Sequence, residues 1–287
     1  MKVIGNIIKF ILAIILTICI IVCIGVNVAS STILNKDFVL QKLDETNYYA
    51  NIYTAVESDF ENYIYQSGLD EEVLENIVTP EKIENDTKVI INNIYDGTDE
   101  QIDITEIENN LRTNIEQSLN GNLSATQKKM VDEFINKITE QYQDTMTSTS
   151  YEDNIHNLLT KGMTIIKLAN VASIIGIVVS AIIILVISFR RVWSGFMFIV
   201  SSAIASGVFY IFANILINAK VRIENITILN DAISITLRAV LTSILNQLTT
   251  TGIIITIVGV IILIVFAMMD SYHKRKKEIE DESEEES

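Results

Sequence analysis

Apolar residues are concentrated in four runs, which occupy residues 7–29, 168–189, 196–217 and 252–269. At a helical rise of about 1.5 Å per residue, each run is long enough to cross a hydrocarbon layer of roughly 30 Å. Lys9 is the only charged residue inside them. The pattern therefore predicts four membrane-spanning helices. The first run is longer than the apolar part of a signal peptide, so we interpret it as a retained anchor; cleavage near Ala29 is the alternative.

Between the first and second runs, apolar residues return every three or four positions, which is typical of amphipathic helices. The first of these helices is predicted to carry one apolar face, formed by Leu43, Tyr49, Ile52, Val56, Phe60 and Tyr63. In the next helix, Thr79 serves as the N-cap and Pro80 lies in the first turn. Gly97 breaks that helix.

Two further helices complete this polar segment. A capping box starts the third helix, formed either by the pair Asp103–Glu106 or by the pair Thr105–Glu108. The apolar seam of the third helix is Ile107, Leu111, Ile115 and Leu119. A box formed by Ser124 and Gln127 caps the fourth helix. The apolar positions of the fourth helix are Met130, Phe134, Ile138 and Tyr142.

The predicted fold is all-α, a four-transmembrane-helix membrane protein with a helical-bundle domain between the first and second spans. Its parts are the N-terminus with the first span (1–29), the acidic helical domain (30–163), a hairpin of the second and third spans (164–217), an amphipathic helix (218–251), the fourth span (252–269) and a basic, then acidic tail (270–287). The amphipathic helix either lies in the membrane interface or extends the fourth span to brace the acidic domain. The end of the tail is almost wholly acidic and is predicted to be disordered.

Basic residues crowd against the predicted spans on one side of the membrane. Lys2 and Lys9 precede or begin the first span, Arg190 and Arg191 join the second to the third, and residues 274–277 follow the fourth. Because basic residues favour the cytoplasmic side, both termini are predicted to be cytoplasmic and residues 30–163 extracytoplasmic. A chain so rich in Ile and Asn is typical of a bacterial protein, which indicates a bacterial cell membrane.

Charge is segregated as strongly as hydropathy. The chain has a mean hydropathy of +0.36 and a formal net charge of -15. Residues 30–163 hold 26 acidic and nine basic residues. This excess repels polyanions, so nucleic acid is excluded as a partner. The acidic surface either keeps the domain soluble or attracts a cationic partner.

The sequence contains no recognisable catalytic, nucleotide-binding or metal-binding motif. Residues 92–103 resemble a calcium loop centred on Gly97, but Ile94 stands where an oxygen ligand is needed, so we interpret the stretch as a turn between helices. Cys19 and Cys23 share one face of the first span, where we interpret them as small apolar residues. We therefore expect no enzyme activity, no metal and no cofactor.

Two sets of residues are candidates for specific contacts. Tyr48 and Tyr65 lie off the apolar face of their helix, where they would present aromatic rings to a partner. Within the membrane, small residues repeat every four positions, which lets helix backbones approach closely. These are Ala172, Gly176 and Ser180 in the second span and Ala203 with Gly207, or Ser202 with Ser206, in the third. They pack within the chain or, alternatively, in a homo-oligomer.

These features favour a non-enzymatic multi-pass membrane protein of the cell envelope, whose outer helical domain binds a protein partner or senses a condition. The order of one span, an outer domain and three spans resembles that of the membrane subunits of ABC-type mechanotransmission assemblies of the cell-division kind. The resemblance implies a subunit of a transport or mechanotransmission assembly, although the connection from Arg190 to Gly195 is shorter than the cytoplasmic segment with which those subunits engage their ATPase. A small oligomeric channel is the third hypothesis. Besides the lipid bilayer, the expected partner is a protein or a second copy of the chain.

The predicted topology can be tested by labelling single cysteines in intact cells. With Cys19 and Cys23 replaced by alanine, cysteines are placed at Asp99 and, separately, at Ser287. A membrane-impermeant maleimide should label position 99 in intact cells and position 287 only after lysis. Labelling of both positions from the same side would contradict the topology.

Overall fold

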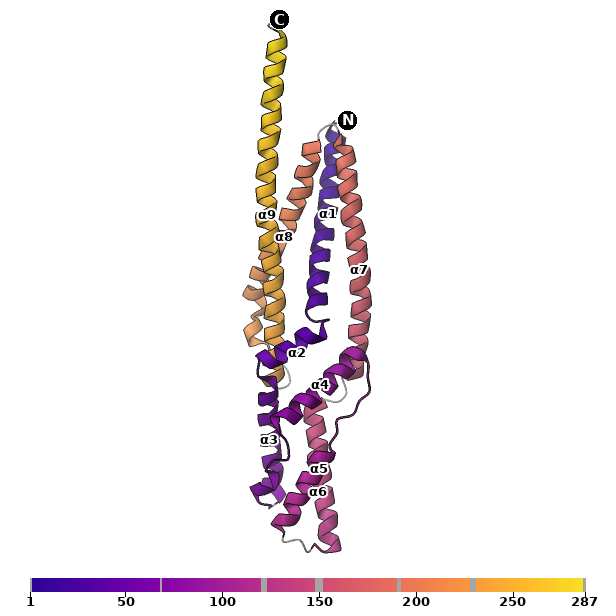
Figure 1. Ribbon diagram of the computed structural model, residues 1–287, viewed down its shortest axis with the longest axis vertical. Coiled ribbons are helices and arrows are strands. Elements are labelled where there is room, and N and C mark those ends of the chain that lie inside the picture. The colour runs from indigo at the N-terminus through magenta and orange to yellow at the C-terminus, as the bar shows by residue number, and fades with distance from the viewer. Residues whose placement is uncertain are drawn as a thin grey trace. The chain divides into compact units, whose positions relative to one another are not determined.

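The computed structural model describes residues 2–67, 69–119, 123–147, 152–189, 192–227 and 231–285. In these residues every regular element is helical (Figure 1). The elements are α1 (Lys2–Ser31), α2 (Lys36–Glu45), α3 (Tyr48–Ser67), the short 3-10 helix η1 (Glu71–Leu74), α4 (Pro80–Asp96), α5 (Thr105–Ser118), α6 (Ala125–Thr147), α7 (Glu152–Ile187), α8 (Val192–Val221), the 3-10 helix η3 (Ile223–Asn225) and α9 (Asp231–Glu285). The all-α prediction is confirmed for this part of the chain.

The chain divides into two compact units. The apolar unit contains residues 1–32, 163–225 and 241–287, and the polar unit contains residues 33–162 and 226–240. The polar unit therefore includes the acidic domain that the sequence predicts, together with a second segment from far along the chain.

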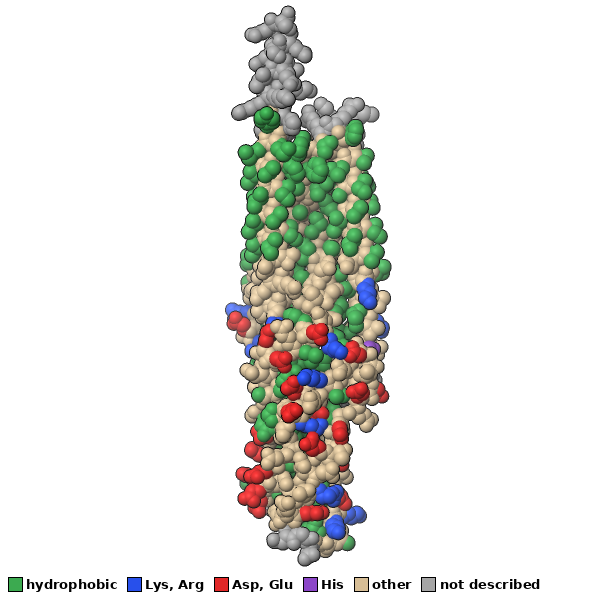
Figure 2. Space-filling model, viewed as in Figure 1, with side chains coloured by type: hydrophobic (Ala, Val, Ile, Leu, Met, Phe, Trp, Pro, Cys, Tyr) green, Lys and Arg blue, Asp and Glu red, His purple; other side chains and the backbone are tan. Residues whose placement is uncertain are grey.

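Four helices of the protein are long and apolar enough to cross a membrane. They cover Gly5–Ser31, Ile155–Ile187, Val192–Asn225 and Asp231–Met269. Three of them contain a predicted run, and the second covers its run except for residues 188 and 189. Their large apolar side chains point outward, and Phe212, for example, is 61% exposed. Figure 2 shows these side chains covering the surface of the apolar unit. A surface of this kind is stable in lipid and is compatible with a multi-pass membrane protein.

The polar unit has the opposite organisation, with apolar residues inside and charged residues outside (Figure 2). Its most deeply buried side chains are Ile52, Val56 and Ile64 of α3, Ile83 of α4, Ile107, Leu111 and Ile115 of α5, and Ile135, Ile138 and Tyr142 of α6. The burial of apolar area is the main favourable contribution to folding of such a bundle in water. Acidic side chains on the outer face remain hydrated.

Local capping signals predicted from the sequence are confirmed in two helices. The hydroxyl of Thr79 accepts a hydrogen bond from the Lys82 backbone N–H, and Pro80 occupies the first turn of α4. Gly97 ends α4 with φ +71°, a left-handed conformation that glycine adopts without steric cost. At the start of α6, Ser124 and Gln127 accept hydrogen bonds from each other's backbone N–H, as a capping box requires.

The helix predicted to carry the first apolar face is divided in two. The helix α2 ends at Glu45 and α3 begins at Tyr48, because Asn47 between them adopts φ +52°, which interrupts the helix. Asparagine tolerates this left-handed conformation better than most residues. Leu43 therefore belongs to a different helix from Tyr49, and the prediction of one continuous face was wrong.

Neither predicted capping box starts α5. The helix begins at Thr105, and its N-cap residue, Ile104, has no side-chain acceptor. Instead, the carboxylate of Asp103 accepts a hydrogen bond from the Thr105 backbone N–H. The Asp103 side chain thus forms a turn with the backbone two residues later, and this turn satisfies a free N–H group at the start of the helix without a capping box.

Two apolar positions in the predicted seams are wrong as well. Leu119 follows the last residue of α5 and is exposed. Met130 of α6 is exposed, whereas Val131 is buried. Because a helix turns by about 100° per residue, a shift of one position moves a side chain from the core to the surface.

The helix α9 differs from the predicted arrangement of residues 218–287. It runs without interruption from Asp231 to Glu285, so the amphipathic segment and the fourth span form one helix, as in the second of the two interpretations. The tail through Glu285 is helical rather than disordered. Extending an existing helix adds one hydrogen bond per residue and needs no new nucleus, which accounts for helix in so acidic a segment. The predicted positions Arg190 and Arg191 lie outside the described residues.

A buried ion pair lies in the core of the polar unit, and nothing in the sequence pattern had marked it. Asp86 is 4% exposed. It accepts hydrogen bonds from the Lys82 ammonium at 2.6 Å and from the Tyr142 hydroxyl at 2.5 Å. Burial, together with the hydrogen bond to Asp86, raises the pKa of Tyr142 far above its ordinary value, so this phenol stays protonated and donates.

Replacing Asp86 should destabilise the polar unit strongly. D86A leaves the Lys82 ammonium and the Tyr142 hydroxyl buried without a partner, and loss of one member of a buried pair costs about 3–5 kcal/mol. The matched control is E84A, which removes the exposed Glu84–Lys88 pair of the same helix and should cost less than about 1 kcal/mol. The measurement is urea unfolding of the full chain in detergent, followed by near-ultraviolet circular dichroism of the tyrosines. Equal midpoints for the two variants would contradict the prediction.

Candidate functional site

A mainly apolar cavity of about 330 Å³ lies within the polar unit. Its walls come from α2, α4 and the first turns of α3, α7 and α9, and representative residues are Leu43, Tyr48, Ile91, Ile94, Ile155 and Leu237. Sites for small ligands or inserted side chains typically have volumes of about 300–1,000 Å³ and walls of this composition. The cavity is therefore the principal candidate for a binding site in the polar unit.

A few polar groups lie in or beside the apolar wall. The hydroxyls of Thr46 and Thr236 share a hydrogen bond of 2.8 Å, and the Tyr95 hydroxyl donates to the carbonyl oxygen of Ile33 at 2.6 Å. Burial raises the pKa of Tyr48 and of Tyr95 to about 12. Both phenols are therefore neutral at physiological pH and act as hydrogen-bond donors.

Two neighbouring tyrosines pack against each other at the cavity wall. Tyr48 and Tyr49 pack edge to face with ring centroids 5.9 Å apart. Burial, together with the nearby carboxylates of Asp44 and Glu84, raises the pKa of Tyr49. This phenol is therefore held in its protonated form beside the cavity.

The two tyrosines that the sequence singled out lie in different environments. The structure places Tyr65 on the surface of α3, 91% exposed. It places Tyr48 half-buried against the apolar core, in the wall of the cavity. Tyr48 begins α3 directly after the interruption at Asn47. The sequence did not predict this interruption, so helix periodicity could not predict which way the Tyr48 side chain faces. The role of either residue in contacting a partner stays a prediction.

The calcium-like stretch is a turn stabilised by Asn93. The carbonyl oxygen of the Asn93 side chain accepts hydrogen bonds from the Thr98 hydroxyl and the Glu100 backbone N–H, and its amide donates to the Glu100 carbonyl. Together with the left-handed Gly97, these bonds agree with the interpretation as an inter-helix turn. Among the described residues, no group of three His, Cys, Asp or Glu side chains is arranged to hold a metal ion.

In the apolar unit, glycines lie at the closest approaches between helices. A Cβ atom added to Gly176 of α7 would lie 2.5 Å from the Cys19 sulfur of α1. A Cβ atom added to Gly207 of α8 would lie 2.5 Å from the Gly252 carbonyl oxygen of α9. Helices therefore follow one another in the order α7, α1, α8, α9 (Figure 1). Two of the predicted packing residues, Gly176 and Gly207, thus make contacts within the chain.

The remaining predicted packing residues are distributed differently. Ser180 is buried, whereas Ala172 is exposed and its neighbour Ser173 is buried in its place. In α8, Ala203 is only half-buried. Both members of the alternative pair, Ser202 and Ser206, are buried. The buried positions of this predicted set are therefore mainly serine and glycine rather than alanine.

Hydroxyl groups attach α8 to α1. The Ser202 hydroxyl donates to the Ala13 carbonyl oxygen at 3.0 Å, and the Thr17 hydroxyl lies 3.4 Å from the Ser202 carbonyl oxygen, to which it donates. The Tyr210 hydroxyl donates to the Ile21 carbonyl oxygen at 2.5 Å. Such bonds stabilise helix pairs in lipid, where apolar burial gives no preference for association.

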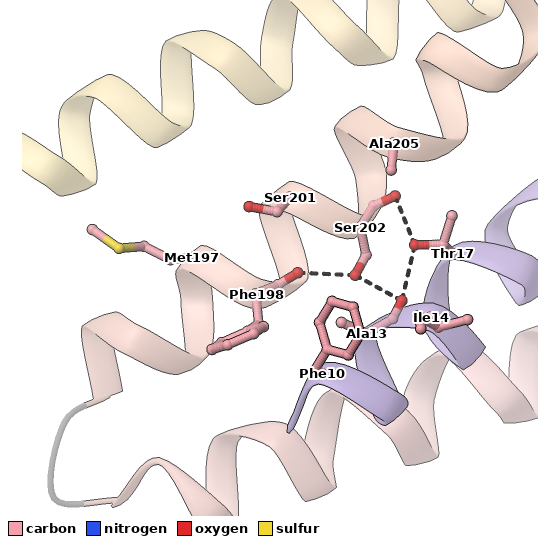
Figure 3. Close-up of a pocket in the computed structure, with 9 residues that line it drawn as sticks. All are labelled: Phe10, Ala13, Ile14, Thr17, Met197, Phe198, Ser201, Ser202 and Ala205. Carbon is pink, nitrogen blue, oxygen red and sulfur yellow. Dashed lines mark hydrogen bonds between the residues drawn. The ribbon is translucent and has the colours of Figure 1, made fainter. Parts of the chain in front are cut away.

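A groove of about 360 Å³ follows this α1–α8 contact. Figure 3 shows its lining, which is mostly apolar: Phe10, Ala13, Ile14 and Thr17 of α1, and Met197, Phe198, Ser201, Ser202 and Ala205 of α8. The hydroxyls of Thr17 and Ser202 are engaged with backbone carbonyl oxygens (Figure 3). The groove is therefore suited to hydrocarbon.

No family model, no curated protein and no solved structure matches this chain.

Adding one methyl group at Gly207 should weaken the α8–α9 contact. In G207A the new Cβ would collide with the Gly252 backbone and with Thr256, so the helices must separate. The control is G162A, because a Cβ at Gly162 of α7 meets nothing within 4 Å and alanine favours helix by about 1 kcal/mol. We expect a lower melting temperature for G207A and an unchanged or higher one for G162A. Trp193 of α8, which packs on Phe266 of α9, reports the transition by its fluorescence; a melting temperature of G207A at or above that of the wild type would refute the contact.

Proposed function

We propose that this chain is a non-enzymatic multi-pass membrane protein of the cell envelope, whose polar unit is an extracytoplasmic domain that binds a protein partner. The observation that supports this most directly is the composition of the cavity wall. Ile155 of α7 and Ile233 and Leu237 of α9 line it, and both helices continue without a break into candidate spans.

Because these helices are continuous, a structural change caused by binding in the cavity can be transmitted to the spans. A partner that occupies the cavity contacts the first turns of α7 and α9 directly. If two packings of these turns exist, the partner shifts the population toward the packing that it contacts better, and the attached spans shift with it. The polar unit acts as receiver and the spans act as anchor and coupling element.

The chemistry of the polar unit specifies the kind of partner. Its cavity takes an apolar or aromatic side chain, and the phenol of Tyr48 in its wall offers a hydrogen-bond donor to a backbone carbonyl. Around it, residues 30–163 carry 26 acidic against nine basic residues. A partner with an apolar anchor surrounded by Lys and Arg satisfies both features, since charge complementarity accelerates association and a buried anchor provides affinity.

Site-specific photo-crosslinking in membranes of the native cells tests this function. Benzoylphenylalanine replaces Tyr48, in the wall of the cavity, in the full chain. We expect one discrete protein adduct whose yield falls as salt is raised, because screening weakens the attraction to the acidic surface.

The cavity-filling variant V39F should lower the yield of that adduct about tenfold, equivalent to about 1.4 kcal/mol of binding free energy. Val39 lines the cavity. The control M130F changes an exposed residue outside the cavity and should leave the yield unchanged. An adduct that survives in V39F at the control level, or the formation of no protein adduct, would refute the proposal.

A further inference from the structure

Lys9 is a buried cation with no counter-ion among the described residues. It is the fifth residue of the apolar stretch Gly5–Ser31 and is 8% exposed. Its ammonium lies 5.5 Å from the centre of the Phe198 ring of α8, and it forms no hydrogen bond or ion pair with a described residue.

The apolar sequence around it contains no carboxylate. Residues 5–31, 163–187, 192–221 and 241–269 contain neither Asp nor Glu. A charged side chain in an apolar span is costly and normally has a partner. An aromatic face offsets only part of the lost hydration of an ammonium. An anion from a bound molecule would supply the rest.

The groove between α1 and α8 begins at this cation. Phe198 contacts the Lys9 ammonium and also forms part of the groove wall, and Phe10, the next residue of α1, lines the same groove. From Phe10 to Thr17 the lining extends for about 10 Å along the helix, at a rise of about 1.5 Å per residue. Because the hydroxyls of Thr17 and Ser202 are engaged with backbone carbonyls (Figure 3), the mostly apolar groove accepts hydrocarbon while its end accepts an anion.

We propose that this groove binds one anionic phospholipid of the bilayer, with an acyl chain against Phe10, Ile14 and Phe198 and the phosphate on the Lys9 ammonium. An anionic phospholipid combines hydrocarbon chains and a negatively charged headgroup in one molecule. A second copy of this chain would fill the groove with apolar side chains and bring no anion to Lys9 from its apolar runs, which carry no carboxylate. The site is independent of the function proposed for the polar unit.

Photoactivatable lipids test the proposal on the full chain in vesicles. Wild-type protein is reconstituted in phosphatidylcholine vesicles that contain a trace of phosphatidylglycerol or of phosphatidylcholine, each with a diazirine in the acyl chain. Adducts are mapped by mass spectrometry. We expect the glycerol lipid to label residues 10–17 and 197–205 about tenfold more than the choline lipid, which corresponds to about 1.4 kcal/mol of affinity.

Two matched pairs of variants separate charge from shape. K9Q should reduce labelling by the glycerol lipid to the choline level and K9R should restore the preference, whereas K167Q, which removes an exposed lysine of α7, should have no effect. A205F fills the groove and should abolish labelling by both lipids there. A172F makes the same change at an exposed residue of α7 and should not.

Circular dichroism and a monodisperse elution profile verify the fold of each variant, and A205F tests the site with Lys9 intact. Equal labelling by the two lipids in the wild type, a preference that persists in K9Q, or labelling of A205F at the level of A172F would overturn the proposal, because the groove would then hold surrounding lipid without selection.

Discussion

Close approach of helix backbones at small residues is the constraint on which the apolar unit depends. Its large side chains face outward, where lipid is as apolar as they are, so their burial between helices would give no advantage. What remains is van der Waals contact at Gly176 and Gly207 and hydroxyl-to-carbonyl hydrogen bonds such as that from Ser202 to Ala13. Each of these interactions requires backbones close enough to exclude a larger side chain, which is why the seam contains glycine, serine and threonine.

The polar unit follows the opposite rule within the same chain. Its helices bury Ile, Leu, Val and aromatic side chains and expose carboxylates, as bundles do in water. The helices α7 and α9 obey both rules in turn, because their first turns line the apolar cavity of the polar unit and their later residues are lipid-compatible. The same two helices therefore help to build both units.

Two lysines show how differently the units treat a buried charge. In the polar unit, Lys82 is paired with Asp86, which also accepts a hydrogen bond from Tyr142, so every member of the group is satisfied. In the apolar unit, the only partner of Lys9 among the described residues is the face of Phe198. A satisfied network stabilises the fold in which it lies, whereas an unsatisfied cation is a position where a ligand gains binding free energy. In the apolar unit this position is Lys9, at the end of the α1–α8 groove where we propose that a lipid binds.

The sequence by itself determined the features that depend on neighbouring residues: four helices long enough to span lipid, helix starts at Thr79 and Ser124, and the turn at Gly97. Hydropathy over about 20 residues and local capping bonds act within a few turns, so they can be read along the chain. Only the tertiary structure decided what depends on helix direction and on contacts between distant segments. The interruption at Asn47 places Tyr48 in the cavity wall. Residues 226–240 belong to the polar unit, and Lys9 is buried against Phe198 of α8. A rotation of about 100° per residue makes such outcomes sensitive to a single position, and no local pattern specifies which distant surface a helix face will meet.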